Sequence, residues 1–288
     1  MTLITGAQIL APASDQGFAV PALNLSDYGM LMAAFEVCEE LKSPLMVALG
    51  PKEGNWIGPD FIPAVLSRAA RSNVPTVLHW DHGATLGEAV RAIKLGYTSV
   101  MIDASLEPFE RNVEITARVV EVAHAAGVSV EGELGTIGKT AGADEGGTDD
   151  ILYTEPSEAV EFAERTGVDS LAIAIGTRHG IYPKTLKPEL RLGLLDSIDA
   201  VVDVPLVLHG GSDNPDGEIR DACGRGINKV NISSDVKRAF YDAMREVLAD
   251  TSLLDPRLIV PGAMEAVKDL VRHKIDLFGS AGTIHYYD

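Results

Sequence analysis

Residues 75–83 read Pro-Thr-Val-Leu-His-Trp-Asp-His-Gly, an apolar run typical of a β-strand that ends abruptly in polar residues. Two later apolar runs, 170–180 and 205–211, also reach a histidine followed by glycine. The histidines concerned are His82, His179 and His209. A single histidine at a strand end is more often a structural hydrogen-bonding residue. Three in the same setting predict a catalytic zinc site, which needs three neutral imidazoles and one open position.

The composition is that of a soluble globular protein, because 46% of the 288 residues are hydrophobic. The amino-terminal residues carry no basic segment before an apolar one, and no apolar run approaches the roughly 18 to 20 residues of a membrane span. We therefore expect a cytoplasmic protein without a membrane partner. The net charge of −18 opposes binding to nucleic acid, although local backbone N–H groups could still hold a small anion.

Apolar runs alternate with longer amphipathic segments along the whole chain, which is the pattern of βαβ units around a buried parallel sheet. The eight apolar runs are 19–25, 44–50, 75–81, 99–105, 129–135, 170–176, 205–211 and 229–235. The segments expected to be helical are 28–42, 59–72, 86–95, 108–126, 156–166, 188–200, 215–224 and 234–248. Eight such pairs predict an α/β fold, a single-domain (β/α)8 TIM barrel over residues 1–288, with a helical extension from about residue 250.

In such a barrel the active site lies where the strands end at the carboxyl face. Polar residues collect at these predicted strand ends: Asn24, Asp81, His82, Asp103, Glu133, His179, His209, Asn231, Ser233 and Ser234. Because buried polar groups need partners, this ring favours a site over an accident of the core.

The order of residues in the first stretch adds a condition. In a regular strand His79 and Asp81 would share one face and His82 the other, so Asp81 and His82 can serve one site only if the chain turns there, which Gly83 permits. We expect His79 to pack or to orient a neighbour. Residues 136–153, rich in Gly and Asp, are expected to form a loop over the site or, alternatively, a solvated surface loop.

Eight motifs together resemble one family. They are Leu-His-Trp-Asp-His-Gly (78–83), Ser-Val-Met-Ile-Asp-Ala-Ser (99–105), Val-Glu-Gly-Glu-Leu-Gly (130–135), Leu-Tyr-Thr-Glu-Pro (152–156), Ile-Gly-Thr-Arg-His-Gly (175–180), Val-Leu-His-Gly-Gly-Ser (207–212), Lys-Val-Asn-Ile-Ser-Ser-Asp (229–235) and Leu-Phe-Gly-Ser-Ala-Gly (277–282). From end to end the chain resembles the zinc-dependent class II ketose-bisphosphate aldolases, in particular the fructose- and tagatose-bisphosphate members.

The resemblance implies a lyase that cleaves a ketose 1-phosphate or 1,6-bisphosphate into glycerone phosphate and an aldehyde. Zinc on His82, His179 and His209 would polarise the C2 carbonyl, and Asp81 would take the C4 hydroxyl proton. Asp103 and Glu133 would lie near a second cation. The residues implied at the glycerone-phosphate end are Gly180, Gly210, Gly211, Ser212, Asn231, Ser233 and Ser234, with Asn24 beside the reacting carbons. The resemblance also implies a homodimer or homotetramer.

Three positions depart from the family pattern. Residues 48–52 read Ala-Leu-Gly-Pro-Lys instead of a Gln-x-Ser-x-Gly run, and Asp213 replaces a glycine. The first departure implies an acceptor other than glyceraldehyde 3-phosphate, whereas Arg257 keeps the arginine that binds a distal phosphate. Ala141 occupies the place of the loop carboxylate that exchanges a proton on the enediolate. We hypothesise that Glu145, ahead of Asp144, is this base, the alternative being that both are solvated surface acids.

Two other functions stay open from the sequence alone. One is a Schiff-base barrel lyase, for which the candidate lysines are Lys94, Lys139 and Lys229. Lys94 falls in a predicted helix and Lys229 at the start of a strand, at the wrong end of the barrel, which leaves Lys139. The other is a zinc-binding barrel that senses a sugar phosphate without turnover.

Overall fold

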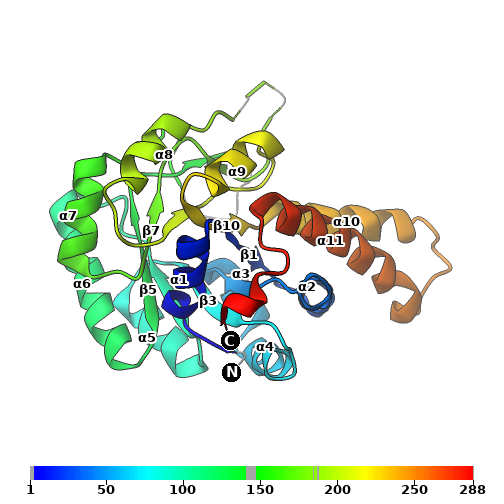
Figure 1. Ribbon diagram of the computed structural model, residues 1–288. Helices are drawn as coiled ribbons and strands as arrows, with labels where there is room; N and C mark the ends of the chain where they lie inside the picture. Colours follow the sequence, from blue (N-terminus) through cyan, green and yellow to red (C-terminus); the bar gives the residue numbers. More distant parts are fainter. Residues whose placement is uncertain (1–2, 141–146, 184, 187, 288) are drawn as a thin grey trace.

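The eight apolar runs form a closed barrel of parallel strands (Figure 1). The computed structural model describes residues 3–140, 147–183, 185–186 and 188–287. Around the barrel the strands follow the order β1-β10-β9-β7-β5-β4-β3-β2. Their bounds are β1 Val20–Asn24, β2 Leu45–Leu49, β3 Thr76–Gly83, β4 Ser99–Ile102, β5 Ser129–Leu134, β7 Ser170–Ile173, β9 Leu206–Leu208 and β10 Ile227–Ile232. The predicted (β/α)8 fold is therefore confirmed.

Helices surround this barrel (Figure 1). Their bounds are α1 Gly6–Gln16, α2 Tyr28–Leu41, α3 Pro51–Ile57, α4 Phe61–Ala70, α5 Leu86–Leu95, α6 Phe109–Ala125, α7 Pro156–Thr166, α8 Leu192–Asp199, α9 Asp216–Cys223, α10 Ser234–Val247 and α11 Pro256–Phe278, followed by a 3-10 helix, Thr283–Tyr287. Each predicted helix is present, although α8 begins four residues later than the predicted segment 188–200. None of the helices in the described residues is long and apolar enough to cross a membrane.

Two helices were not predicted, and each lies next to an end of the barrel. Helix α1 contacts the early residues of several strands, and the Ala7 N–H donates to Ser129 Oγ at 2.9 Å, so α1 lies against the amino ends of the strands. Its start carries a capping box in which Thr5 and Gln8 satisfy each other's backbone N–H groups. Helix α3 follows β2 directly at the opposite, carboxyl end, where it borders the site described below.

Helices α10 and α11 pack side by side and project from the barrel as an arm (Figure 1, orange to red). The base of α11 packs on α2, which fixes the arm to the barrel. The expected carboxy-terminal extension is the second half of this arm together with the 3-10 helix.

Short parallel strands β6 (Gly138–Lys139) and β8 (Arg178–His179) form a separate sheet. The predicted loop of residues 136–153 is therefore partly ordered by backbone pairing, because Thr136 also pairs with Leu152. The Thr140 N–H donates to the carbonyl oxygen of His179 at 2.9 Å, which ties this segment to a candidate metal ligand.

Candidate active site

A local irregularity in β3 turns Asp81 and His82 toward one centre. Pairing of β3 with β4 is regular up to Trp80 and resumes at Gly83, so the register shift falls on the two residues between them. His82 has φ of 48°, in the left-handed region that costs a non-glycine residue roughly 1–3 kcal/mol and occurs preferentially at functional sites. The turn that the sequence requires is therefore at His82 itself and not at Gly83, which instead permits close contact with the Trp80 indole and the Met101 carbonyl.

The three predicted zinc ligands meet at the carboxyl face of the barrel. The imidazole centroid of His82 lies 5.0 Å from that of His179 and 4.5 Å from that of His209, and the last two are 6.0 Å apart. One ring nitrogen from each lies within 4.8 Å of the other two. These residues come from β3, from β8 and from the residue after β9, so the arrangement depends on the closed barrel.

Carboxylates fix the orientation of two of these rings. The Nδ1 of His82 lies 3.0 Å from Asp103 Oδ2, and the Nε2 of His209 lies 2.8 Å from Glu131 Oε1. Because an ionised carboxylate only accepts, each of these nitrogens must carry the proton. The opposite nitrogens, His82 Nε2 and His209 Nδ1, are buried without a hydrogen-bond partner among the described residues. An unprotonated imidazole nitrogen without another partner, on a ring whose N–H is held by a carboxylate, is what a zinc ion binds, so the residues fit a metal.

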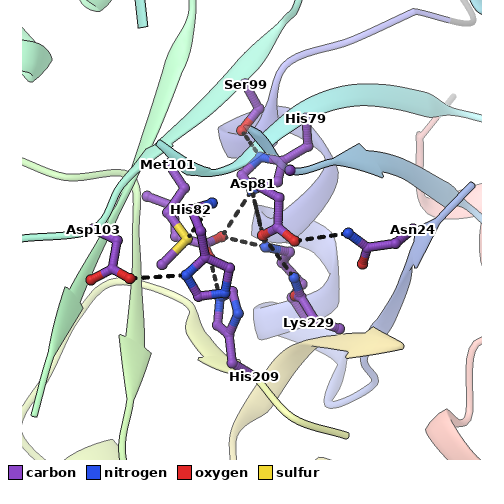
Figure 2. A network of polar contacts seen from close by, with 12 residues as sticks. Asn24, His79, Asp81, His82, Ser99, Met101, Asp103, His209 and Lys229 are labelled. Atoms are coloured by element: carbon purple, nitrogen blue, oxygen red, sulfur yellow. Dashed lines mark hydrogen bonds and ion pairs between the residues drawn. The ribbon is translucent and has the colours of Figure 1, made fainter. Parts of the chain in front are cut away.

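Asp81 lies beside these histidines with both carboxylate oxygens held. Asn24 Nδ2 donates to Oδ2 at 3.0 Å (Figure 2). Asn231 Nδ2 donates to Oδ1 at 3.0 Å. The side chain is 1% exposed. Burial alone would raise the pKa of the Asp81 carboxyl, but the positive charge of His82 holds it well below its usual range. Asp81 is therefore an ionised, oriented proton acceptor.

The field around His82 favours positive charge. Burial opposes protonation of this imidazole, yet the carboxylates of Asp81 and Asp103 raise its pKa to about 10. A divalent cation can supply that charge once the imidazole gives up its proton. His209 differs, because burial and the charge of His82 lower its pKa and leave it neutral, the form that binds metal.

A second group of possible cation ligands shares His82. One atom each from His82, Asp103 and Glu133 lies within 4.8 Å of the others. Burial, and then the charge of Asp103, raises the pKa of Glu133 well above its usual range. Two carboxyls this close repel when both are ionised, and a cation would relieve that repulsion.

The polar residues expected at the phosphate end line a small cavity next to the histidines. The lining residues are Gly180, Gly210, Ser212, Asn231, Ser233 and Ser234, together with Asn24, Asp81, His82, His179 and His209. Gly180 and Gly210 both have positive φ. Gly211 is adjacent, but its N–H donates to the Asn231 carbonyl at 3.1 Å and is thus occupied within the barrel.

A family model described as fructose-bisphosphate aldolase class-II matches residues 4–283, which is nearly the whole chain. The chain belongs to the class II fructose-bisphosphate aldolase family. It is 34% identical to the YdjI aldolase from Escherichia coli K12, with a TM-score of 0.87 over 98% of this chain and 99% of that chain. It is 27% identical to a proposed fructose-1,6-bisphosphate aldolase from Coccidioides immitis, with a TM-score of 0.87 and 98% of each chain covered.

A fructose-bisphosphate aldolase from Campylobacter jejuni shares the fold, with a TM-score of 0.79 at 23% identity over 97% of this chain and 96% of that chain. The resemblance inferred from the eight sequence motifs is thus confirmed at the level of the family and the fold.

The structure of this family member also contains a site residue that sequence reasoning missed. Glu131 accepts from His209 with one oxygen, and its other oxygen lies 2.6 Å from Lys229 Nζ. Lys229 Nζ in turn lies 3.3 Å from Nε2 of His79. The Nδ1 of the same ring lies 2.8 Å from Ser99 Oγ. Burial lowers the pKa of His79 to about 3, so this ring is neutral. His79 thus belongs to the barrel interior, as the sequence predicted.

The expected position of Lys229 was wrong. It is the third residue of β10, is fully buried, and faces into the barrel toward Glu131. The alternation of side chains along a strand could have predicted this orientation. Lys229 shares a strand face with the site residue Asn231, and Glu131 shares one with Glu133. As an ammonium paired to a carboxylate, Lys229 is not the uncharged amine of a Schiff-base enzyme. The other two candidates, Lys94 and Lys139, are exposed.

We expect Lys229→Met to destabilise the protein by about 3–5 kcal/mol, because it leaves the Glu131 carboxylate buried without its counter-charge. Urea unfolding would measure this. The matched control is the double variant Lys229→Met with Glu131→Gln, which removes both charges and should recover much of the lost stability. A single variant within about 1 kcal/mol of the wild type would show that the pair does not support the core.

Arg257 and the candidate loop bases are the remaining site residues expected from the sequence. Arg257 is the second residue of α11 on the projecting arm, where its side chain is 87% exposed and bonds to Asp255. It therefore does not reach the active site of its own chain. Asp144 and Glu145, the candidate loop bases, lie outside the described residues, as does Ala141.

Proposed function

We propose that the protein is a lyase that reversibly cleaves a ketose 1-phosphate or 1,6-bisphosphate to glycerone phosphate and an aldehyde, with zinc as its resident metal. The observation that carries this proposal is the convergence of His82, His179 and His209 around the ionised, doubly held Asp81. The alternative of a sugar-phosphate sensor has no observation in its favour.

The three histidines would hold the metal through one nitrogen each, with His82 offering Nε2 and His209 offering Nδ1. Asp103 and Glu131 would keep these two rings in the required tautomer. A bound zinc ion supplies Lewis-acid polarisation of the C2 carbonyl and stabilises the negative charge that develops during cleavage. Asp103 and Glu133 are also the side chains that we propose for a second cation.

Asp81 would accept the proton of the C4 hydroxyl as the bond between C3 and C4 breaks. Asn24 and Asn231 prevent its carboxylate from rotating, since each holds one oxygen. The amide oxygens of both asparagines are buried without a partner among the described residues, so they are available to accept from substrate hydroxyl groups. This combination of a fixed base and open acceptors suits a polyhydroxylated substrate.

The phosphate of glycerone phosphate would lie in the cavity lined by Gly180, Gly210, Ser212, Ser233 and Ser234. Ser233 precedes the 14-residue helix α10, and its hydroxyl is buried without a partner among the described residues. Helix N-termini and small residues bind phosphate through backbone N–H groups, which a chain of net charge −18 requires. Gly211 would position the neighbouring cavity residues through its N–H, which donates to the Asn231 carbonyl.

The test of this function is a coupled assay on a panel of ketose 1-phosphates and 1,6-bisphosphates. Glycerone phosphate released from a substrate is reduced by a second enzyme, and the reduction is measured. We expect turnover of at least one member of the panel by the zinc-loaded protein. Absence of release from every member, even with enzyme in excess, would contradict the proposal and favour the sensor.

We also propose that Glu145, or else Asp144, exchanges a proton on the enediolate carbon, since this step needs a carboxylate within hydrogen-bond reach. The double variant Glu145→Gln with Asp144→Asn should lose hydrogen–deuterium exchange of glycerone phosphate while it retains zinc. Each single variant serves as the control for the other. Wild-type exchange by the double variant would place the base elsewhere.

A further inference from the structure

A cavity of about 400 Å³ opens beside Asp81 on the side away from the phosphate cavity. Asn24, Asp81 and His82 line both cavities, so the reacting groups lie where the two meet. A sugar whose phosphate occupies the phosphate cavity therefore extends its other half into the 400 Å³ cavity. This inference rests on the proposed function and concerns the chemical class of that other half.

We propose that the aldehyde half of the substrate is uncharged and carries no phosphate. Four carboxylates line the larger cavity: Glu53, Asp81, Asp103 and Glu107. Among the described lining residues the counterparts are His82, which belongs to the metal site, and one lysine, Lys52, which lies exposed at the rim. A phosphate dianion entering here would find one lysine and no arginine among the described lining residues, and the carboxylates of Glu53 and Glu107 would oppose it, which costs binding free energy.

Of the cavity carboxylates other than Asp81, Glu53 is the one bonded to Asn24, beside the reacting groups. Its Oε1 lies 2.6 Å from Lys237 Nζ, and its Oε2 accepts from the Gly50 N–H at 3.3 Å and from Asn24 Nδ2 at 3.4 Å. The carboxylate is therefore held in place and cannot swing away from an incoming anion. It also engages the Lys237 ammonium, which would otherwise be the nearest cationic partner for a phosphate, so Glu53→Gln would release this lysine.

Part of the lining of the cavity is apolar. Ala104 and Leu106 follow β4, and Ile115 belongs to α6. Leu106 is 72% exposed although it lies at the mouth of a cavity, so a bound carbon chain would cover it. A lining that mixes apolar side chains with carboxylates suits a short aldehyde with hydroxyl groups and a neutral end, such as glyceraldehyde or lactaldehyde, because the carboxylates accept from hydroxyls and the apolar side chains contact carbon.

The experiment is condensation, in which glycerone phosphate loses a proton from C3 to the loop base, the resulting enediolate carbon adds to the aldehyde carbonyl, and Asp81, protonated from water, gives its proton to the new hydroxyl oxygen. The zinc-loaded wild-type protein is given glyceraldehyde, lactaldehyde or glyceraldehyde 3-phosphate as acceptor. We expect kcat/KM for the better neutral aldehyde to exceed that for glyceraldehyde 3-phosphate at least about tenfold. An equal or higher value for the phosphorylated aldehyde overturns the inference.

Variants test the cause of this selectivity. Glu53→Gln and Glu107→Gln should each shift the ratio of the two kcat/KM values toward glyceraldehyde 3-phosphate, whereas Glu121→Gln, an exposed acid of α6 outside the cavity, should leave it unchanged. The ratio is informative even if Glu53→Gln slows both reactions through Asn24. A ratio unmoved in both cavity variants contradicts the charge argument.

Hydrogen–deuterium exchange of glycerone phosphate without any aldehyde separates the two levels of the proposal. Exchange accompanied by a preference for glyceraldehyde 3-phosphate refutes only the uncharged acceptor. Failure of exchange and of every condensation refutes the aldolase function itself.

Discussion

Asp81→Asn should lose about 10² to 10⁴ in kcat for carbon–carbon cleavage, because removal of a general base typically costs this much. The amide keeps the shape of the carboxylate but cannot accept the C4 hydroxyl proton. In addition, Asn24 and Asn231 both donate to Asp81, and the new amide group can accept at only one of its two ends. One of the flanking amides must therefore turn over or lose its partner.

Zinc content separates this catalytic defect from a structural one. Asp81 is not one of the three nitrogen ligands, so Asp81→Asn should keep one zinc per chain and should still bind glycerone phosphate. Glu121→Gln, at an exposed acid of α6 outside both cavities, is the control and should keep the wild-type kcat. An unchanged kcat in Asp81→Asn would move the base to another residue, with Glu133 the next candidate.

His82→Ala, His179→Ala and His209→Ala should each lose stoichiometric zinc and with it all measurable cleavage. The effect is large because the two imidazoles that remain in each variant make an incomplete zinc site. The three ligands come from three different segments of the chain, so a neighbouring residue of the same segment does not take the place of the lost ring. Metal analysis of the purified protein, together with the rate of glycerone phosphate release, measures both losses.

His79→Ala is the control for these variants. This histidine is equally buried but bonds to Ser99 and Lys229, and it offers no nitrogen to the metal. The variant should lose stability through the unpaired groups that it leaves, yet it should keep its zinc. Loss of zinc from His79→Ala, or retention by any of the other three, would contradict the ligand assignment.

The barrel strands could be predicted because they are buried on both faces and appear as continuous apolar runs, as in β2, where all five residues are buried. Helix α3 could not, since it has no buried residue and hence no apolar stripe to give it a period. Helix α1 was not predicted from hydrophobic periodicity, although the capping box of Thr5 and Gln8 at its start indicates a helix.

The candidate ligands and the base could be predicted because each lies at a strand end, where the barrel fixes its direction. The contact between Glu131 and Lys229 could not, since these residues are 98 positions apart and no local pattern sets their distance. The left-handed backbone of His82 also had no signal, because that conformation favours glycine. Tertiary packing imposes it.

The measurement that tests the central claim most directly is hydrogen–deuterium exchange of glycerone phosphate by metal-free protein during titration with zinc. It needs no knowledge of the aldehyde, and it reports the enediolate chemistry itself. We expect no exchange without metal and a rate that rises in proportion to added zinc up to one equivalent per chain. A full rate of exchange in the metal-free protein would contradict the account.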